Sequence, residues 1–189
     1  MSLRHCLGVL LGFGLFLSAP QVWARDGLVI SGTEVDTLLQ APHESTQEFQ
    51  VRVFQRLREF TRENGFEAAG SFCRNKQGQM GVLIFTWHAY FSAPYMGGCP
   101  IKTPDLTGEF VHSHPLPGTY LLTQQDVEQI NRSRWLFKIK QPKKMYISLS
   151  DTQRFSKNDY EVGDGFLVSD GVVFYQKGKG TQEFVMRLP

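Results

Sequence analysis

Two histidines and an aspartate stand at a spacing that suits a metal site. His112-Ser113-His114 follows a short strand-like segment, and residues two apart on an extended chain point to the same side. Both imidazoles can therefore converge on one ion. Asp126 stands near the start of the next predicted helix, which can bring its carboxylate back as a third ligand. Three protein ligands leave a fourth position open, as in catalytic zinc sites, where zinc makes water nucleophilic at neutral pH.

The same residues also have purely structural explanations. A His-x-His segment is often a strand with a polar face. Thr123-x-x-Asp126 is a helix-capping pattern that needs no metal. The two explanations are compatible, because a cap would also fix Asp126 in place. The spacing alone leaves metal binding and a structural role open.

The order of these residues resembles the signature of the JAMM (MPN+) metalloproteases. That signature is a glutamate, a later His-x-His, about seven residues, and Ser-x-x-Asp. Here Glu67-Ala68-Ala69-Gly70 follows a predicted helix, His112-Ser113-His114 comes later, and Thr123-x-x-Asp126 closes the pattern. The resemblance spans roughly Ser45 to Arg134. The chain is also similar to the bacterial JAB-like domains of uncharacterised function.

The resemblance implies a role for each matching residue. His112, His114 and Asp126 would ligate zinc. Glu67 would be the general base that carries a proton from water to the leaving amine, with Glu109 as the fallback. Thr123 would stand for the family's serine, with its hydroxyl steadying an oxyanion. The implied fold is a mixed β-sheet flanked by helices, JAB/MPN-like and cytidine-deaminase-like.

Two departures from the signature are visible. The loop between His114 and Thr123 is one residue longer than usual, and threonine replaces serine. A longer surface loop costs little, and threonine keeps the hydroxyl. We therefore expect the metal site to be preserved.

The elements that must position these residues can be predicted from pattern. Ser45-Thr46-Gln47-Glu48 is a capping box, apolar residues at helical spacing follow it, and Gly65 ends the helix. Strands are predicted over 66–74 and 81–91, joined by a glycine-containing turn. The segments 92–108 and 116–122 are expected to be loops, with a short strand at 109–111 and a helix from Thr123 to about Arg134. Further strands near 144–149, 166–169, 172–176 and 184–187 complete an α+β fold.

Length, charge and the N-terminus limit the class of protein. The chain has 189 residues with a formal net charge of +2, which argues against a dedicated nucleic-acid binder. Residues 1–24 have a basic start, an apolar stretch of signal-peptide length and a Val-Trp-Ala cleavage pattern. We expect export to the periplasm or beyond, a single domain at 25–189, and no stable membrane insertion after cleavage. Cys73 and Cys99 then form a disulfide or remain two buried thiols, and an oxidising compartment favours the disulfide.

The sequence thus supports two functional hypotheses. The first is an exported zinc-dependent metallo-hydrolase that cleaves an amide, peptide or isopeptide bond in a peptide or protein. The second is a non-catalytic JAB-like binding or scaffold module, which can be associated with a toxin. The two diverge at Glu67, because only the hydrolase requires its carboxylate beside the metal.

Overall fold

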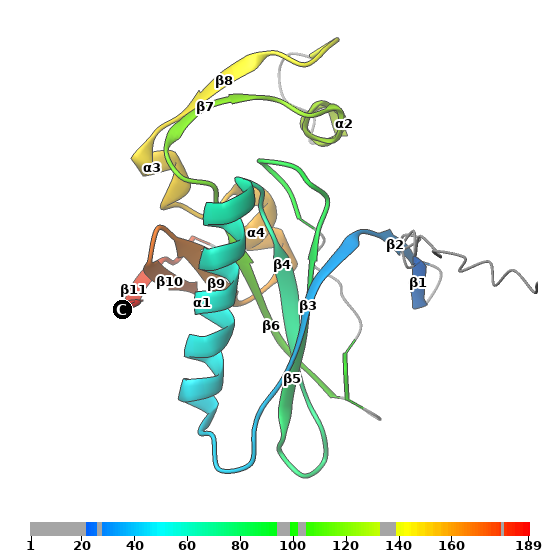
Figure 1. The fold of residues 1–189 in the computed structure, drawn as a ribbon, viewed down its shortest axis with the longest axis vertical. Coiled ribbons are helices and arrows are strands. Elements are labelled where there is room, and N and C mark those ends of the chain that lie inside the picture. The colour runs from blue at the N-terminus through cyan, green and yellow to red at the C-terminus, as the bar shows by residue number, and fades with distance from the viewer. Residues whose placement is uncertain (1–21, 26–27, 94–98, 102–104, 133–138, 179) are drawn as a thin grey trace, which may run out of the picture.

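A computed structural model describes residues 22–25, 28–93, 99–101, 105–132, 139–178 and 180–189 (Figure 1). Most of the predicted signal peptide, residues 1–21, lies outside the described residues. β1 (Val22–Arg25) and β2 (Leu28–Ser31) pair as a separate antiparallel ribbon. The part of the chain that is described contains no helix long and apolar enough to cross a membrane.

A mixed sheet of seven strands forms the centre of the molecule, in the order β11-β10-β9-β6-β4-β5-β3. β6 and β9 run parallel and the other neighbours are antiparallel. The predicted α+β fold with a mixed sheet is therefore confirmed. The strand bounds are β3 (Thr33–Leu39), β4 (Ala69–Arg74), β5 (Met80–Thr86), β6 (Asp105–Ser113), β9 (Gly165–Ser169), β10 (Val172–Gln176) and β11 (Glu183–Arg187).

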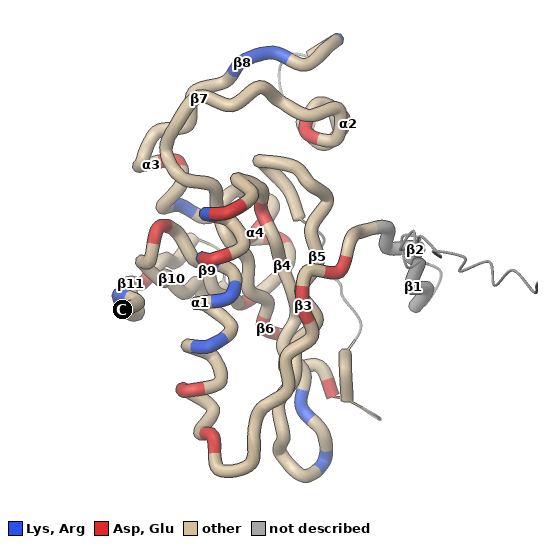
Figure 2. The backbone as a smooth tube through the Cα atoms, viewed as in Figure 1, with Lys and Arg blue, Asp and Glu red and all other residues tan. Residues whose placement is uncertain are grey.

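The long helix α1 (Thr46–Asn64) covers one face of this sheet (Figure 1). It begins at the predicted capping box, in which the Ser45 side chain accepts from the Glu48 amide, and ends at Gly65 in the left-handed conformation. Its buried side chains pack with residues of β4, β6 and β9 in the main core. Acidic and basic residues both occur on its outer side (Figure 2).

The opposite face of the sheet is covered by two short helices, α3 (Leu149–Thr152) and α4 (Lys157–Val162). A second apolar cluster forms there, where Phe110 of β6 and Leu167 of β9 meet Phe155. Because side chains alternate along β6, Val111 packs on the α1 side while Phe110 and His112 lie together on this side. The α3–α4 face is therefore the one that bears a histidine.

Two strands and a helix from 118–132 and 144–147 form a third unit above the sheet (Figure 1). β7 (Gly118–Leu121) pairs with β8 (Lys144–Ile147), and α2 (Gln124–Arg132) lies beside them. We call β7, α2 and β8 the cap. The expected loop at 116–122 is wrong in part, since the tertiary pairing with β8 makes 118–121 a strand.

Cys73 of β4 forms a disulfide with Cys99, with the Cα atoms 6.1 Å apart. This confirms the predicted pairing. β6 also begins earlier than expected, at Asp105, because Leu106 pairs with Cys73 across the sheet.

Candidate metal centre

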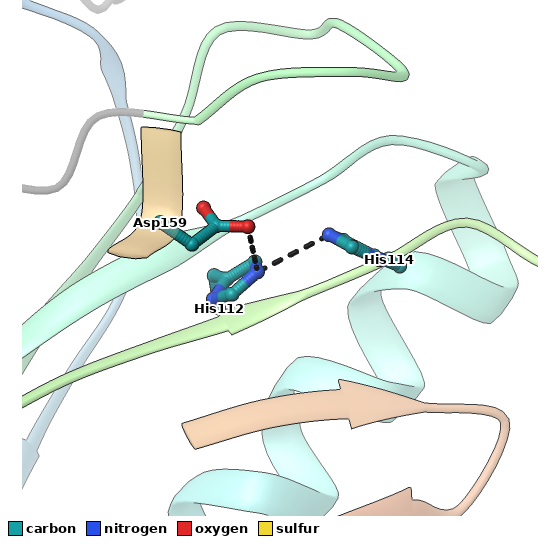
Figure 3. Close-up of side chains that lie close together, drawn as sticks. All are labelled: His112, His114 and Asp159. Atoms are coloured by element: carbon teal, nitrogen blue, oxygen red, sulfur yellow. Dashed lines mark hydrogen bonds and ion pairs between the residues drawn. The ribbon is translucent and has the colours of Figure 1, made fainter. Parts of the chain in front are cut away.

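Two imidazoles and one carboxylate converge at the end of β6 (Figure 3). His112 is on β6 and His114 follows its last residue, so both rings project to the α4 side. The third member is Asp159, whose ligand atom lies within 4.8 Å of both histidine nitrogens. His112 and Asp159 are buried, and His114 is nearly so. This buried group could hold a metal ion.

The distances are close to those of a tetrahedral ligand shell. The two Nε2 atoms are 3.2 Å apart, and His112 Nε2 is 3.7 Å from Asp159 Oδ2. Ligands about 2.0–2.2 Å from a tetrahedral zinc ion would be separated by about 3.4 Å. Nitrogen and carboxylate donors are also the ones that catalytic zinc sites use. The donor set and its spacing therefore fit a zinc-sized cation.

His114 is held in the form that a metal needs. Its Nδ1 is 3.0 Å from the Thr152 carbonyl oxygen, which can only accept, so Nδ1 carries the proton and donates. In the neutral ring the lone pair is then on Nε2, which points at the group. Metal-ligating histidines usually donate their other N–H in this way.

Burial keeps both imidazoles neutral. It lowers the pKa of His112 below the ordinary value, against the opposing effect of the Asp159 charge. Burial also lowers the pKa of His114, and the neighbouring His112 lowers it further. Neutral imidazoles offer lone pairs to a cation without first losing a proton.

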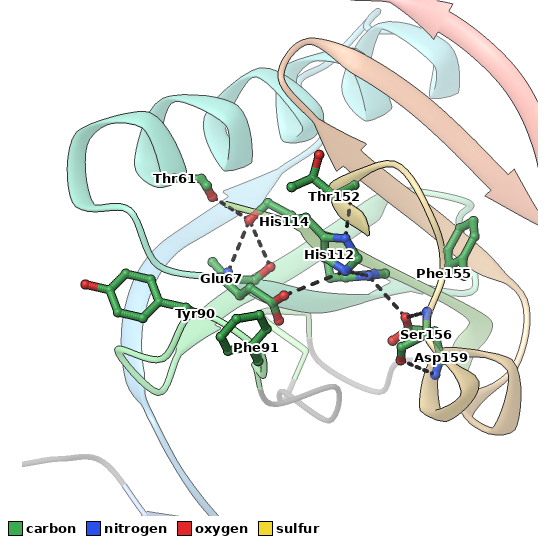
Figure 4. A network of polar contacts seen from close by, with 12 residues as sticks. Thr61, Glu67, Tyr90, Phe91, His112, His114, Thr152, Phe155, Ser156 and Asp159 are labelled. Carbon is green, nitrogen blue, oxygen red and sulfur yellow. Dashed lines mark hydrogen bonds and ion pairs between the residues drawn. The ribbon is translucent and has the colours of Figure 1, made fainter. Parts of the chain in front are cut away.

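Glu67 lies beside this group, as the sequence predicted (Figure 4). Its Oε1 is 3.7 Å from His114 Nε2, and only 6 % of the residue is exposed. Burial raises the pKa of the Glu67 carboxyl well above its ordinary value, and the charges of Asp159 and Asp126 add to this. Burial thus favours the protonated form of Glu67, and a general acid–base group must be able to hold and release a proton.

Ser113 fixes the position of Glu67 relative to the histidines. Its hydroxyl lies 2.6 Å from the Thr61 hydroxyl and accepts from the Ala68 amide at 3.2 Å. The Ser113 amide donates to the Ala68 carbonyl at 2.9 Å. The residue between the two histidines is thus bonded to the residue after Glu67, which connects the two parts of the site.

Asp126, the predicted third ligand, is not part of this group. Its Oδ1 accepts from the Tyr90 and Phe91 amides at 2.8 and 3.0 Å. Its Oδ2 accepts from the Thr123 amide and hydroxyl at 2.8 and 2.7 Å. These four bonds occupy both oxygens. The Thr123 hydroxyl is one of the donors, so it takes part in the N-terminal capping of helix α2. Asp159 stands where Asp126 was expected.

The fallback base, Glu109, has a different role. It accepts a hydrogen bond from the Tyr175 hydroxyl at 3.1 Å. This bond connects β6 to β10, so Glu109 has a structural role in the sheet.

A signal for Asp159 was present in the sequence. Three Ser/Thr-x-x-Asp segments follow the histidines, at 123–126, 148–151 and 156–159. Ser156-x-x-Asp159 has the serine of the signature, and both Ser148 and Ser156 begin capping boxes. The segment at Thr123 was chosen because its distance from His114 is close to that in the signature. In the structure the whole cap lies between His114 and α4, so the aspartate that reaches the histidines comes later in the chain.

A cavity of about 540 Å³ opens on the candidate centre. Glu67, His114, Ser156 and Asp159 contribute to its lining, as do residues of the cap. A substrate could therefore reach the metal-binding side chains.

Comparisons with known proteins add no relative: no family model matches the chain, and no curated protein or solved structure matches it significantly.

Proposed function

We propose that this protein is an exported zinc-dependent hydrolase of the JAMM type that cleaves an amide, peptide or isopeptide bond. One observation carries the proposal. The donors of His112, His114 and Asp159 meet at distances that suit a tetrahedral cation, and the Glu67 carboxylate lies beside them. The disulfide is in keeping with export, because disulfides persist in oxidising compartments.

The side chains have complementary roles in such a reaction. When bound, zinc would polarise the scissile carbonyl and make water nucleophilic. Glu67 would take a proton from the attacking water as its oxygen bonds to the carbonyl carbon. The same carboxyl would then give the proton to the nitrogen as the carbon–nitrogen bond breaks, leaving an acid and an amine.

Ser156 takes over the role expected for Thr123. Its Oγ accepts from the Asp159 amide at 3.3 Å, which leaves its own proton able to donate, and it lines the cavity. We assign it to the oxyanion that forms from the carbonyl oxygen.

The position of Glu67 favours the hydrolase over the binding module. A scaffold gains nothing from a buried carboxyl near two other carboxylates, since burial of such a group disfavours its charge. A proton shuttle needs that arrangement. The resemblance implies a peptide or protein substrate, which would reach the centre through this cavity.

Zinc content of matched variants tests the ligand set. Purified mature protein should hold about one zinc per chain by elemental mass spectrometry, and Asp159→Asn and His114→Ala should lose it. Asp151→Asn is the matched control, because Asp151 completes the same kind of capping box on α3 and lines the same cavity. It should keep zinc, as should Asp126→Asn. A metal-free wild type, or full zinc in Asp159→Asn, would overturn the proposed centre.

Glu67→Gln separates catalysis from metal binding. This variant should keep zinc and lose hydrolysis of a mixed peptide and isopeptide library by at least 100-fold, the lower range for a proton-transfer group. Undiminished hydrolysis in Glu67→Gln would refute its role as the base.

A further inference from the structure

The cap is inserted between the second and third members of the metal-binding group. The chain passes from His114 through the cap to α3 and α4, which bear Asp159. The cap has its own small apolar cluster, and Phe91 from the body and Met145 from β8 pack against it. The cap therefore has a small core of its own, and its residues line the same cavity as Glu67, His114 and Asp159.

The cavity lies between this cap and the body, and its two walls differ in charge. The described lining residues from the cap and from the 90–92 segment carry no charge; they are Tyr90, Phe91, Ser92, Gln129, Ile130, Met145, Tyr146 and Ile147. Asp151, Arg154 and Lys157 lie on the α3–α4 side. β7 is uncharged along its length and β8 has a lysine only at its start (Figure 2).

We propose that the cap forms a subsite for an apolar side chain next to the bond that is cleaved. This inference rests on the proposed hydrolase function. Tyr146 lines the cavity and is 69 % exposed although it is aromatic, so a ligand that contacts its ring would remove the ring from water. An apolar side chain seated there gains from burial, whereas a charged one would lose its hydration without an opposite charge on that wall.

Asp126 is the positioning residue of this subsite. It joins the start of α2 to the backbone of Tyr90 and Phe91 through four hydrogen bonds. Tyr90 and Tyr120 add a ring contact between body and cap, with centroids 4.6 Å apart. The carboxylate therefore fixes the two sides of the apolar wall relative to each other.

Two hydroxamates measure the subsite without knowledge of the substrate. Acetohydroxamic acid can bind a zinc ion with an open position, and 3-phenylpropanohydroxamic acid adds an apolar arm to the same chelating group. On zinc-loaded wild type we expect the phenyl compound to bind at least 10-fold tighter by calorimetry, since removing a phenyl group from water favours binding. Equal affinities would overturn the subsite alone. If neither compound binds, the result contradicts the open metal site of the proposed function, and with it the subsite.

Two variants test whether the preference for the phenyl compound arises at the cap. Tyr146→Ser should lower the affinity ratio at least threefold and leave acetohydroxamic acid binding unchanged. Phe184→Ser is the matched control, because Phe184 is also an exposed aromatic, at 59 %, but is on β11 and does not line the cavity. A ratio that falls equally in both variants would refute the assignment.

Asp126→Asn tests the positioning role. The amide keeps the shape of the side chain but turns one acceptor into a donor that faces the Thr123 amide. We expect full zinc content, unchanged acetohydroxamic acid affinity and a ratio that falls at least threefold, whereas general unfolding would lower both affinities. Retention of the full ratio would contradict the role of Asp126.

Discussion

Glu67 is a buried carboxyl whose position suits proton transfer but disfavours its charged form. Its carboxyl is buried near Asp159 and Asp126, and burial raises its pKa well above the ordinary value. A divalent cation nearby would favour the charged form again. The metal-free protein therefore contains a carboxyl that resists ionisation, next to two imidazoles that resist protonation.

The pH dependence of the metal-free protein follows from these shifts. Glu67 binds a proton in the folded state above its unfolded pKa of about 4.3, so its contribution falls as pH rises from there to its raised pKa. His112 and His114, with lowered pKa values, contribute more stability as pH rises to their unfolded pKa of about 6.5. The two effects oppose each other, and each group changes the free energy of unfolding by up to about 1.4 kcal/mol per pH unit between its unfolded and its folded pKa.

Urea unfolding of Glu67→Gln in the presence of a chelator checks this expectation. The stability of wild type relative to this variant should fall as pH rises above about 4.3, whereas the rise due to the unchanged histidines should be present in both proteins. Glu63→Gln, at the exposed end of α1, should behave as wild type. A stability difference between wild type and Glu67→Gln that does not change with pH would contradict the raised pKa of Glu67.

At the scale of elements, the very short helix α4 holds Asp159 in the metal-binding group. Its capping box orients Asp159, since the Ser156 amide donates to Asp159 Oδ2 at 2.5 Å. Buried Gln176 of β10 donates to the Asp159 carbonyl at 2.9 Å and also to the Gly163 carbonyl. Both ends of α4 are thus fixed to neighbours, although six residues form little helix by themselves.

Removal of the N-cap hydroxyl of helix α4 should weaken metal binding. Ser156→Ala loses the N-cap bond from the Asp159 amide to Ser156 Oγ, worth about 1 kcal/mol. The backbone bond from the Ser156 amide to Asp159 Oδ2 stays, but the turn that presents this carboxylate is held less firmly. We expect the zinc Kd to rise about 10-fold in a competitive chelator titration, within the range for groups that orient ligands. Ser148→Ala removes the equivalent cap of α3 and should reduce stability by a similar amount with the Kd unchanged. Equal Kd changes in both variants would indicate a general loss of stability.

The same elements show what the sequence could and could not predict. α1 was predicted closely because nineteen residues display a full apolar stripe between a capping box and a glycine. α3 and α4 have four and six residues, too few for a period, so only their capping boxes mark them. β7 was expected to be a loop, since its strand character comes from pairing with β8 across the cap.

The site was predictable to the same extent. His112 and His114 could be chosen because strand alternation acts locally, whereas Glu67 was chosen through the resemblance to the JAMM signature. Asp159 could not be distinguished from Asp126 or Asp151 by spacing. The choice depends on which short helix packs on β6, a long-range contact between Phe155 and Phe110 that leaves no periodic trace.

At the scale of the whole molecule, the candidate centre joins segments that are distant in sequence. Glu67 precedes β4, the histidines end β6, and Asp159 follows the cap. The parallel pair β6–β9, with His112 opposite Leu167, is the frame on which they meet. The disulfide fixes a further segment, because Cys73 and Cys99 enclose β5 and the Tyr90–Phe91 wall of the cavity.

Reduction of this disulfide should lower stability and leave the metal-binding group in place. For the separation of 26 residues, the chain-entropy model gives about 3.5 kcal/mol. His112, His114 and Asp159 lie outside the enclosed segment, so zinc stoichiometry should not change. Urea unfolding with and without a phosphine reductant measures the loss. Cys99→Ser should match the reduced protein and should not respond to the reductant. A wild type equally stable in both states would show that β4 and the cavity wall are held by packing alone.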